Sequence, residues 1–356
     1  MRYGTVSRLW NDRSITRHLK KKTDGILSGN SPGEDFAILS LDKEDGALFL
    51  ADGFASDSEA FPALRLAMLR ADNNMALSGR KTAAMRLSLV LGEDCPEQKL
   101  RKEMRAAGSF AGENGWELAG GNTVFAFPGD SLSATVTAFS CGRADAGQEH
   151  SGGGEDTMQA LSRGGEDAVR ALSCMAAEES VGAPAAGDIV LVTGFAGAFG
   201  AALLAEKLED DPEQPFSGSY LTNAKHPGGL SVRPAAEILY MLGIRRMKDV
   251  SFGGVYRAMS ELAEKSSLGI SILHEAIPVR QDTIEICEYM KENPYTLTGT
   301  GGLVAICPEN MLDIVSGALS AAGIPFGAAG VLTEEKARKV YSRESGRERF
   351  LDDYRR

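Results

Sequence analysis

The chain has 356 residues, with 38 Lys or Arg against 49 Asp or Glu, so its formal net charge is −11. This acidic balance argues against a protein that binds nucleic acid, because contacts to phosphates require clustered basic side chains. No apolar run approaches the roughly 20 residues that span a bilayer, and the first residues lack the apolar core of a signal peptide.

The N-terminal part of the chain predicts alternating strands and helices. In chain order we expect strands at 36–41 and 47–51, a helix at 61–78, a strand at 83–91, a helix that ends at Gly115, and strands at 123–127 and 133–139. The helix before Gly115 has the clearest pattern, because Leu100, Met104 and Ala107 recur on one helical face.

Residues 141–187 differ in composition from the segments on either side. Glycines punctuate this stretch, and Ala183–Gly187 closes it. We interpret it as an interdomain connection that carries one helix, over 157–179.

A second α/β half follows this connection. We expect, in order, a strand at 188–193, helices at 198–209, 234–242 and 254–266, a strand at 269–273, a helix at 281–291, a strand at 303–307, a helix at 309–322 and a strand at 325–331. The predicted organisation is therefore an N-terminal domain at 1–150, the connection at 151–187, a C-terminal α/β domain at 188–340, and a charged, solvated tail at 341–356.

The five cysteines are odd in number and widely spaced, and they form no C-x-x-C pair. This usage predicts reduced, mostly packed thiols in a cytoplasmic protein. The four histidines are scattered and provide no pair of zinc ligands.

Four short stretches combine glycines with oxygen-bearing side chains: Gly33–Ala37, Ala51–Gly53, Asp72–Gly79 and Gly120–Thr123. We expect each at a strand end or in an adjoining loop, where oxygens converge on a cation and glycines let the backbone approach a phosphate. Asp35 and Asp52 suit a Mg²⁺ ion held with a polyphosphate, and Asn74 and Asn122 suit neutral ligands or hydrogen-bond donors. Each stretch taken alone also fits an ordinary turn, so the order of all four carries the argument.

Two further glycine motifs leave alternatives open. Gly194–Gly200 follows a predicted strand but reads G-x-x-G-x-x-G, and no acidic residue ends a strand at the distance that a nicotinamide site requires. It therefore suits a close strand–helix turn or a phosphate contact. Gly253–Gly254 opens a predicted helix, either to attract an anion or to permit a tight entry, and Asp249 before it either orients a nucleotide or caps the turn.

The order of these motifs resembles one superfamily, which comprises aminoimidazole-ribonucleotide synthase, thiamine-monophosphate kinase, selenophosphate synthetase and the hydrogenase-maturation carbamoyl dehydratase. The matching stretches are Gly33–Ile38, Ala51–Asp52, Asn73–Gly79, Gly120–Thr123, Ala186–Gly194, Met247–Val255, Ile277–Val279, Asn293–Gly302 and Ala321–Thr333. The style of the motifs is nearest to the hydrogenase-maturation branch and its relatives of unassigned role.

The resemblance implies an α+β protein of two α/β domains. The N-terminal half would dimerise through its sheet and bind ATP and Mg²⁺ near the dimer interface, and the C-terminal half would be a mixed sheet with packed helices. The implied nucleotide-site residues are Asp35, Asp52, Asn74, Gly120, Gly121, Asn122 and Asp249. The implied metal ligands are Asp35, Asp52 and Asn74, and no catalytic residue is singled out.

Several positions depart from the family pattern. Asn74 and Asn122 stand where most members have Asp, and each removes one negative charge from the expected metal site. Lys248 replaces a His, and the chain ends without the cysteine that carries the carbamoyl group in the dehydratase.

The leading hypothesis is therefore ATP-dependent phosphoryl transfer that activates a small substrate, related to hydrogenase maturation. One alternative is a non-catalytic dimeric relative that serves as a partner or regulator in a maturation pathway. The other is a small-molecule kinase that resembles thiamine-monophosphate kinase.

Overall fold

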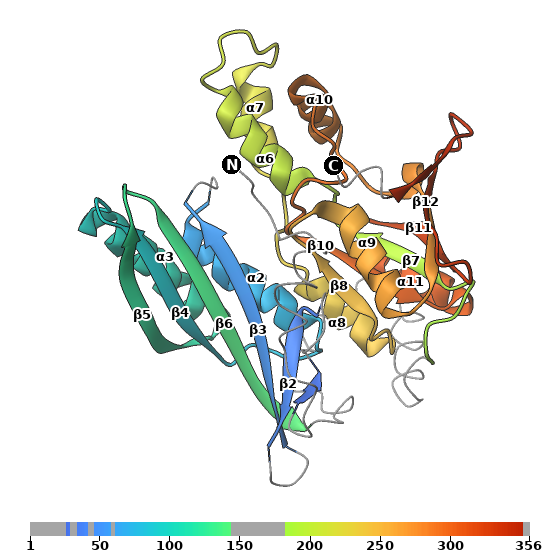
Figure 1. Ribbon diagram of the computed structural model, residues 1–356, viewed down its shortest axis with the longest axis horizontal. Coiled ribbons are helices and arrows are strands. Elements are labelled where there is room, and N and C mark those ends of the chain that lie inside the picture. Colours follow the sequence, from blue (N-terminus) through green and yellow to red (C-terminus); the bar gives the residue numbers. More distant parts are fainter. Residues whose placement is uncertain (1–25, 29–33, 42–45, 58–60, 144–181, 352–356) are drawn as a thin grey trace. The chain divides into compact units, whose positions relative to one another are not determined.

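The computed structural model describes residues 26–28, 34–41, 46–57, 61–143 and 182–351 (Figure 1). These residues fall into two compact units, one within Val6–Gln148 and the other within Glu149–Arg356. The helix predicted at 157–179 and Gly33 lie outside the described residues.

The described part of the N-terminal unit is a six-stranded mixed sheet on which two helices pack. Its elements are β1 (Ile26–Ser28), β2 (Phe36–Ser40), β3 (Gly46–Ser56), α2 (Ala63–Ala76), β4 (Ala84–Gly92), α3 (Glu97–Asn114), β5 (Glu117–Phe127) and β6 (Leu132–Arg143). The strands lie in the order β1-β2-β3-β6-β4-β5, and β4 with β5 is the parallel pair. Long β5 therefore forms one edge of the sheet.

One face of this sheet is buried and the other is open. Along β3, Phe49, Ala51 and Ala55 are buried, whereas Asp52 and Phe54 between them are exposed. This alternation follows from the two-residue period of a strand, and it places the Asp52 side chain on the open face.

Helix α2 packs on the buried face directly over Gly53. A Cβ at this position would lie 2.0 Å from the Ala67 carbonyl oxygen and 2.4 Å from the Ala71 amide nitrogen. The beginning of α2 is held by α3, because Glu103 accepts a hydrogen bond from the Leu64 amide at 3.0 Å. This bond satisfies one of the amides that a helix leaves without a partner at its first turn.

The C-terminal unit is a seven-stranded mixed sheet with packed helices. Its elements are β7 (Ile189–Thr193), α6 (Ala198–Leu208), α7 (Gly218–Ala224), α8 (Arg233–Met241), β8 (Met247–Val250), α9 (Gly254–Lys265), β9 (Gly269–Leu273), η2 (His274–Ala276), α10 (Gln281–Met290), β10 (Gly302–Cys307), η3 (Glu309–Met311), α11 (Leu312–Ala321), β11 (Phe326–Thr333), β12 (Arg338–Tyr341) and β13 (Glu348–Phe350).

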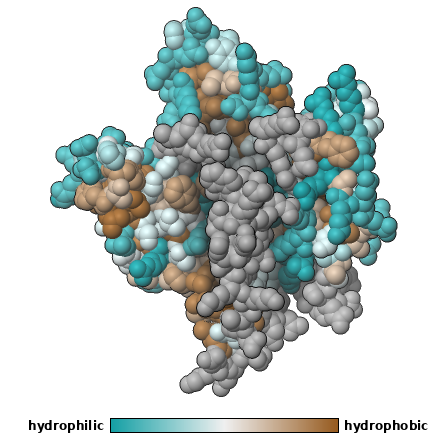
Figure 2. All heavy atoms as spheres, viewed as in Figure 1, coloured by the Kyte–Doolittle hydropathy of each residue, from teal (hydrophilic) through white to brown (hydrophobic). Residues whose placement is uncertain are grey.

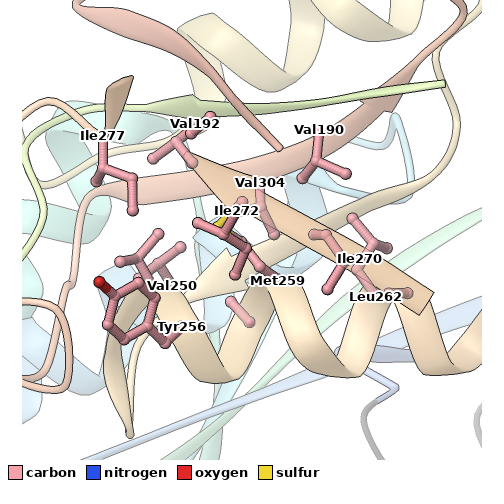
Figure 3. Close-up of a cluster of buried hydrophobic side chains, with 14 of the residues drawn as sticks. Val190, Val192, Val250, Tyr256, Met259, Leu262, Ile270, Ile272, Ile277 and Val304 are labelled. Carbon is pink, nitrogen blue, oxygen red and sulfur yellow. The ribbon is translucent and has the colours of Figure 1, made fainter. Parts of the chain in front are cut away.

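The strand order in this sheet is β13-β12-β9-β11-β7-β10-β8, with β12 parallel to β9 and the other pairs antiparallel. Every residue of β10 is buried, which is typical of a strand covered on both faces. Figure 3 shows the core between α9 and the sheet, where Met259 and Leu262 from the helix meet Val190, Ile270 and Ile272 from the strands. The α+β fold class and the mixed C-terminal sheet are thus confirmed.

The structure also corrects the expected elements. Strand β3 continues to Ser56 rather than ending at residue 51, and β5 begins at Glu117 rather than 123. Residues 342–351, expected to belong to a solvated tail, are mostly exposed, but they form β13 against β12, and the Leu351 side chain beyond this strand is only 3% exposed. Buried apolar contact at Leu351 explains why this charged segment is ordered.

Two of the described cysteines fit the prediction of packed thiols. Cys287 and Cys307 are buried, and burial raises the pKa of the Cys287 thiol to about 12 and that of Cys307 to about 11. Cys141 is exposed and Cys95 is half-buried, so packing does not extend to them. None of the described helices is both long enough and apolar enough to cross a membrane.

Candidate functional site

Asp52 lies within β3, opposite Thr137 of the neighbouring strand β6. The Thr137 hydroxyl donates a hydrogen bond of 2.6 Å to Oδ1 of Asp52. Among the described residues, Oδ2 of the same carboxylate has no hydrogen-bond partner. One oxygen of Asp52 is therefore held by the protein, and the other is available to a ligand.

Strand β3 extends beyond the end of β2, and side chains of α2 bond to its main chain there. Phe36, the first residue of β2, pairs with Ala51. Past this point, the side chains of Arg70 and Asn74 donate to the main-chain carbonyls of Phe54 and Asp52, at 2.7 Å and 2.9 Å. Because Arg70 and Asn74 are one helical turn apart, a single face of α2 makes both bonds.

The bond to Asp52 fixes how the Asn74 amide is oriented. A carbonyl oxygen only accepts hydrogen bonds, so the Nδ2 atom must face it and Oδ1 must point elsewhere. This Oδ1 is buried, and among the described residues it has no hydrogen-bond partner. A buried acceptor without a donor costs free energy, and a bound cation or its water would remove that cost.

Strand register places Asp35 beside Asp52. Asp35 immediately precedes Phe36, whose partner Ala51 immediately precedes Asp52. This register therefore places Asp35, at the start of β2, beside Asp52 of β3, and Asn74 reaches the main-chain carbonyl of Asp52 from the last turns of α2. Two carboxylates and an amide oxygen form the kind of all-oxygen set that suits Mg²⁺. Within the described ranges, no three His, Cys, Asp or Glu side chains form a group that could hold a metal ion.

Asn122 does not join this group within one chain. It is exposed on β5, in register with Ser88 of β4, and β6 lies between β4 and β3. Three strand spacings of about 4.8 Å put its backbone roughly 14 Å from β3. Its side chain is on the same open face of the sheet as Asp52. Across the strands, Asn122 pairs with Ser88, Ser88 with Thr135 and Thr135 with Phe54, which is two residues after Asp52 and therefore on the same face.

Gly120 and Gly121 have a structural explanation in the sheet itself. The pairing of β5 with β4 is irregular at this point, and a Cβ on Gly121 would lie 1.7 Å from the Leu87 carbonyl oxygen. Gly120 has a φ of 91°, a conformation that side chains disfavour. The expectation that the four glycine stretches lie at strand ends or in loops is wrong here and at Asp52, both of which lie inside strands, and at Asn74, which lies in a helix.

Asp249 belongs to the C-terminal unit, on the buried edge strand β8, and is 4% exposed. Its neighbour Lys248, at the position of the family's His, forms an ion pair of 3.2 Å with Glu261 of α9. Burial raises the pKa of the Glu261 carboxyl, but the nearby charges of Lys248 and Arg257 outweigh it, so the net pKa lies below its usual value. Lys248 thus has a partner within its own unit.

The glycines of the dinucleotide-like loop pack against the segment 293–302. A Cβ added to Gly194 would lie 2.6 Å from the carbonyl oxygen of Gly301. A Cβ added to Gly197 would lie 2.3 Å from the carbonyl oxygen of Pro294. Gly254 meets the same segment, 2.4 Å from the Tyr295 carbonyl oxygen. Close backbone packing thus accounts for these glycines, in agreement with the alternative of a tight strand–helix turn.

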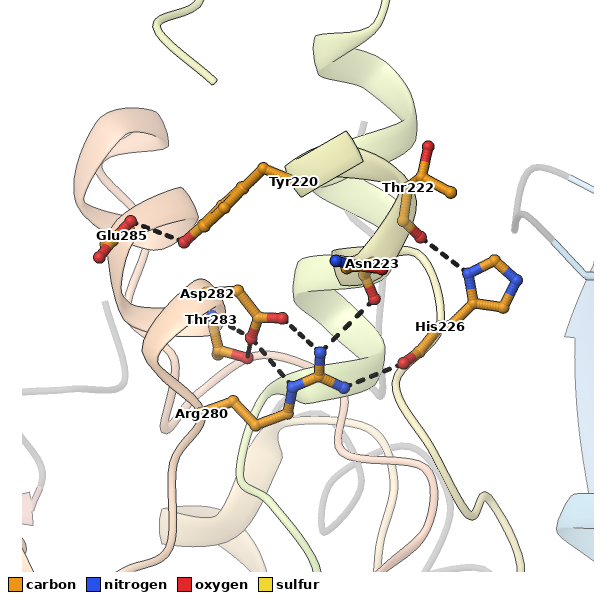
Figure 4. A network of polar contacts seen from close by, with 8 residues as sticks. All are labelled: Tyr220, Thr222, Asn223, His226, Arg280, Asp282, Thr283 and Glu285. Carbon is orange, nitrogen blue, oxygen red and sulfur yellow. Dashed lines mark hydrogen bonds and ion pairs between the residues drawn. The ribbon is translucent and has the colours of Figure 1, made fainter. Parts of the chain in front are cut away.

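Polar contacts fasten α7 to α10 in the C-terminal unit (Figure 4). Arg280 donates to the His226 carbonyl oxygen at 2.9 Å and pairs with Asp282, and the Tyr220 hydroxyl donates to Glu285 at 2.6 Å. Elsewhere in this unit, burial lowers the pKa of His274, whose Nδ1 is 2.6 Å from the Tyr256 hydroxyl oxygen. These contacts hold elements of one unit together.

Sequence reasoning missed Thr137 and Arg70. Both act on β3 through long-range contacts, because Thr137 is 85 positions after Asp52 and Arg70 is 16 positions after Phe54. No local motif marks either residue, and only the strand register and the crossing of α2 over β3 bring them to the site.

Comparison with known proteins agrees with this fold. Residues 185–342 match the family model described as AIR synthase related protein, C-terminal domain. The chain is 26% identical over 280 residues to a putative hydrogenase expression/formation protein of Methanocaldococcus jannaschii, across 76% of this chain and 70% of that protein. It is 24% identical over 258 residues to the carbamoyl dehydratase HypE of Cupriavidus necator, across 72% of this chain and 62%, less than two thirds, of that protein.

Solved structures show the same architecture. The chain superposes on a structure of a HypE–HypF complex with a TM-score of 0.63 at 20% identity, covering 89% of this chain and 92% of that chain. A structure of hydrogenase maturation protein HypE in complex with ATP gives 0.61 at 18% identity, covering 90% and 89%. Residues 185–342 therefore match the AIR synthase-related C-terminal domain, and the chain has the fold of the solved HypE structures.

Proposed function

We propose that the N-terminal unit binds ATP with Mg²⁺ and transfers a phosphoryl group to a small substrate in a maturation pathway. The observation that carries this proposal is the pairing of Asp35 with Asp52 by strand register, beside a buried Asn74 Oδ1 that lacks a donor among the described residues. The relatives support the assignment, because one HypE structure is described as a complex with ATP.

In this proposal each residue has a limited task. Asp35 and Asp52 supply negative oxygens, and Asn74 supplies a neutral one, to hold Mg²⁺ beside the triphosphate. The ion, when bound, would neutralise charge that develops on the phosphoryl oxygens. Thr137 and the carbonyl bond from Asn74 keep Asp52 in place, so the protein contributes positioning rather than a covalent nucleophile.

We also propose that the N-terminal sheet forms a homodimer. Strand β5 is an edge strand of 11 residues, along which Val124 is 41% and Phe125 is 63% exposed. Figure 2 shows hydrophobic side chains at the surface of this unit, where β4 and β5 lie in Figure 1. A long, exposed edge strand ordinarily pairs with another chain or is protected from doing so. Gly120, Gly121 and Asn122 belong to this strand, so a second copy would lie beside them.

A non-catalytic relative remains the second candidate, and Asn74 is the residue that favours it. Its amide nitrogen is engaged by the Asp52 carbonyl, and its oxygen is neutral, so the site holds less negative charge than one built with Asp. In this role the chain would act through a partner. A HypE–HypF complex among its structural relatives supports a maturation protein as that partner.

ATP turnover distinguishes the two candidates. In the absence of its substrate, we expect the purified chain with Mg²⁺ to transfer the γ-phosphoryl group of ATP slowly to water, which yields ADP and phosphate. Asp52→Asn should reduce this rate at least about 100-fold, because the held carboxylate loses its charge. The matched control is Asp94→Asn, which makes the same chemical change at an exposed position outside the site. Equal rates in the wild type and Asp52→Asn, measured by coupled ADP assay, would contradict catalysis at this site.

A further inference from the structure

The Asp52 carboxylate has one oxygen that faces a ligand and another that Thr137 holds. This carboxylate is on the open, solvent-accessible face of the sheet, where a side chain is ordinarily free to change rotamer. One bond restricts this freedom, because the Thr137 hydroxyl donates to Oδ1 at 2.6 Å, while the bond of 2.9 Å from Asn74 holds the main chain of the same residue.

Chemistry decides which group donates in the 2.6 Å hydrogen bond between Thr137 and Asp52. An ionised carboxylate only accepts, so the Thr137 hydroxyl must donate, and a hydrogen bond to a charged acceptor is shorter and stronger than a neutral one. The donor is on β6, which lies between β3 and β4 and is bonded to both. A central strand is a rigid support, so the position of Oδ1 is set before any ligand arrives.

We propose that Thr137 is a positioning residue for the metal site, an inference that rests on the proposed function. By holding Oδ1 of Asp52, Thr137 turns Oδ2 of the same carboxylate toward the cation. Thr137 itself binds neither metal nor nucleotide. Outer partners of this kind orient the ligands of metal sites, and their loss typically lowers metal affinity by about 10–100-fold.

The test compares three variants with the wild type in the full chain. Thr137→Val removes the hydroxyl with little change in shape, and Thr137→Ser keeps it. Thr135→Val makes the first change two residues earlier on the same strand and the same open face, opposite Phe54 rather than Asp52. The probes are Mn²⁺, followed by electron paramagnetic resonance, and a non-hydrolysable ATP analogue titrated by calorimetry with and without Mn²⁺.

We expect Thr137→Val to weaken Mn²⁺ binding in the presence of the analogue about tenfold. Its affinity for the analogue without Mn²⁺ should stay within about twofold of the wild type, and Thr137→Ser and Thr135→Val should bind Mn²⁺ like the wild type. A loss of metal-free and metal-dependent binding alike would indicate a general structural defect and overturn the positioning role. Unchanged Mn²⁺ affinity in Thr137→Val, beside normal wild-type binding, would overturn it as well. If the wild type itself fails to bind Mn²⁺ with the analogue, the proposed function falls, and the role of Thr137 falls with it.

Discussion

Gly53→Ala should destabilise the N-terminal unit by at least about 3 kcal/mol, the largest effect that we expect from one added methyl group. The new Cβ would overlap the backbone of α2, at 2.0 Å from the Ala67 carbonyl oxygen and 2.4 Å from the Ala71 amide nitrogen. Backbone atoms of a packed helix cannot turn aside as a side chain can, so α2 must move away from β3. Because α2 carries Asn74, nucleotide binding should be lost together with stability.

Urea unfolding followed by tryptophan fluorescence measures this effect in the correct unit. The chain has two tryptophans, Trp10 and Trp116, and both precede residue 148, with Trp116 buried at 9% exposure. Gly108→Ala on α3 is the control, because a Cβ there meets nothing within 4 Å and alanine favours a helix. An unfolding midpoint of Gly53→Ala equal to the wild type would contradict the packing of α2 on β3.

Asn74→Asp should have opposite effects on the empty and the loaded protein. Without ligand, a carboxylate oxygen would replace Nδ2 against the Asp52 carbonyl, so the hydrogen bond becomes a repulsion that costs about 1–3 kcal/mol. With Mg²⁺ and ATP present, the added negative charge strengthens the hold on the cation. The substitution should therefore lower the melting temperature of the metal-free chain and enlarge the increase that Mg²⁺ and ATP produce.

Asn114→Asp provides a matched control for this experiment. Asn114 also donates through Nδ2 to a main-chain carbonyl, that of Phe110 at 2.8 Å, but it lies at the exposed end of α3. It should lose some stability without changing the response to Mg²⁺ and ATP in differential scanning fluorimetry. If Asn74→Asp responds to these ligands no more than the wild type does, Asn74 is not a ligand of the cation.

The sequence predicts most helices and strands of this fold because their apolar residues recur with the period of the element. Helix α3 is the clearest case, with its stop at Gly115 in the left-handed conformation. Strand β8 is not predicted, because Lys248 and Asp249 interrupt its apolar pattern. The structure tolerates Lys248 in this buried strand because Glu261 is its ion-pair partner.

The candidate site is only partly readable from the sequence. The motif order directs attention to Asp35, Asp52 and Asn74; strand register then places Asp35 beside Asp52, and the α2 crossing brings Asn74 to the Asp52 main chain. It does not reveal that Asn122 is three strands away in the same chain, nor that Thr137 holds Asp52. Both facts depend on the order of strands in the sheet, which chain sequence and local pattern leave open.

The central claim is that the N-terminal unit binds ATP together with Mg²⁺ at Asp35, Asp52 and Asn74. Calorimetric titration of ATP into the wild-type chain, with and without Mg²⁺, tests it most directly. We expect saturable binding with Mg²⁺ and clearly weaker binding after the ion is removed with a chelator, because the two carboxylates then face the triphosphate without a cation between them. No binding up to millimolar ATP in the presence of Mg²⁺, or equal binding without it, would contradict the claim.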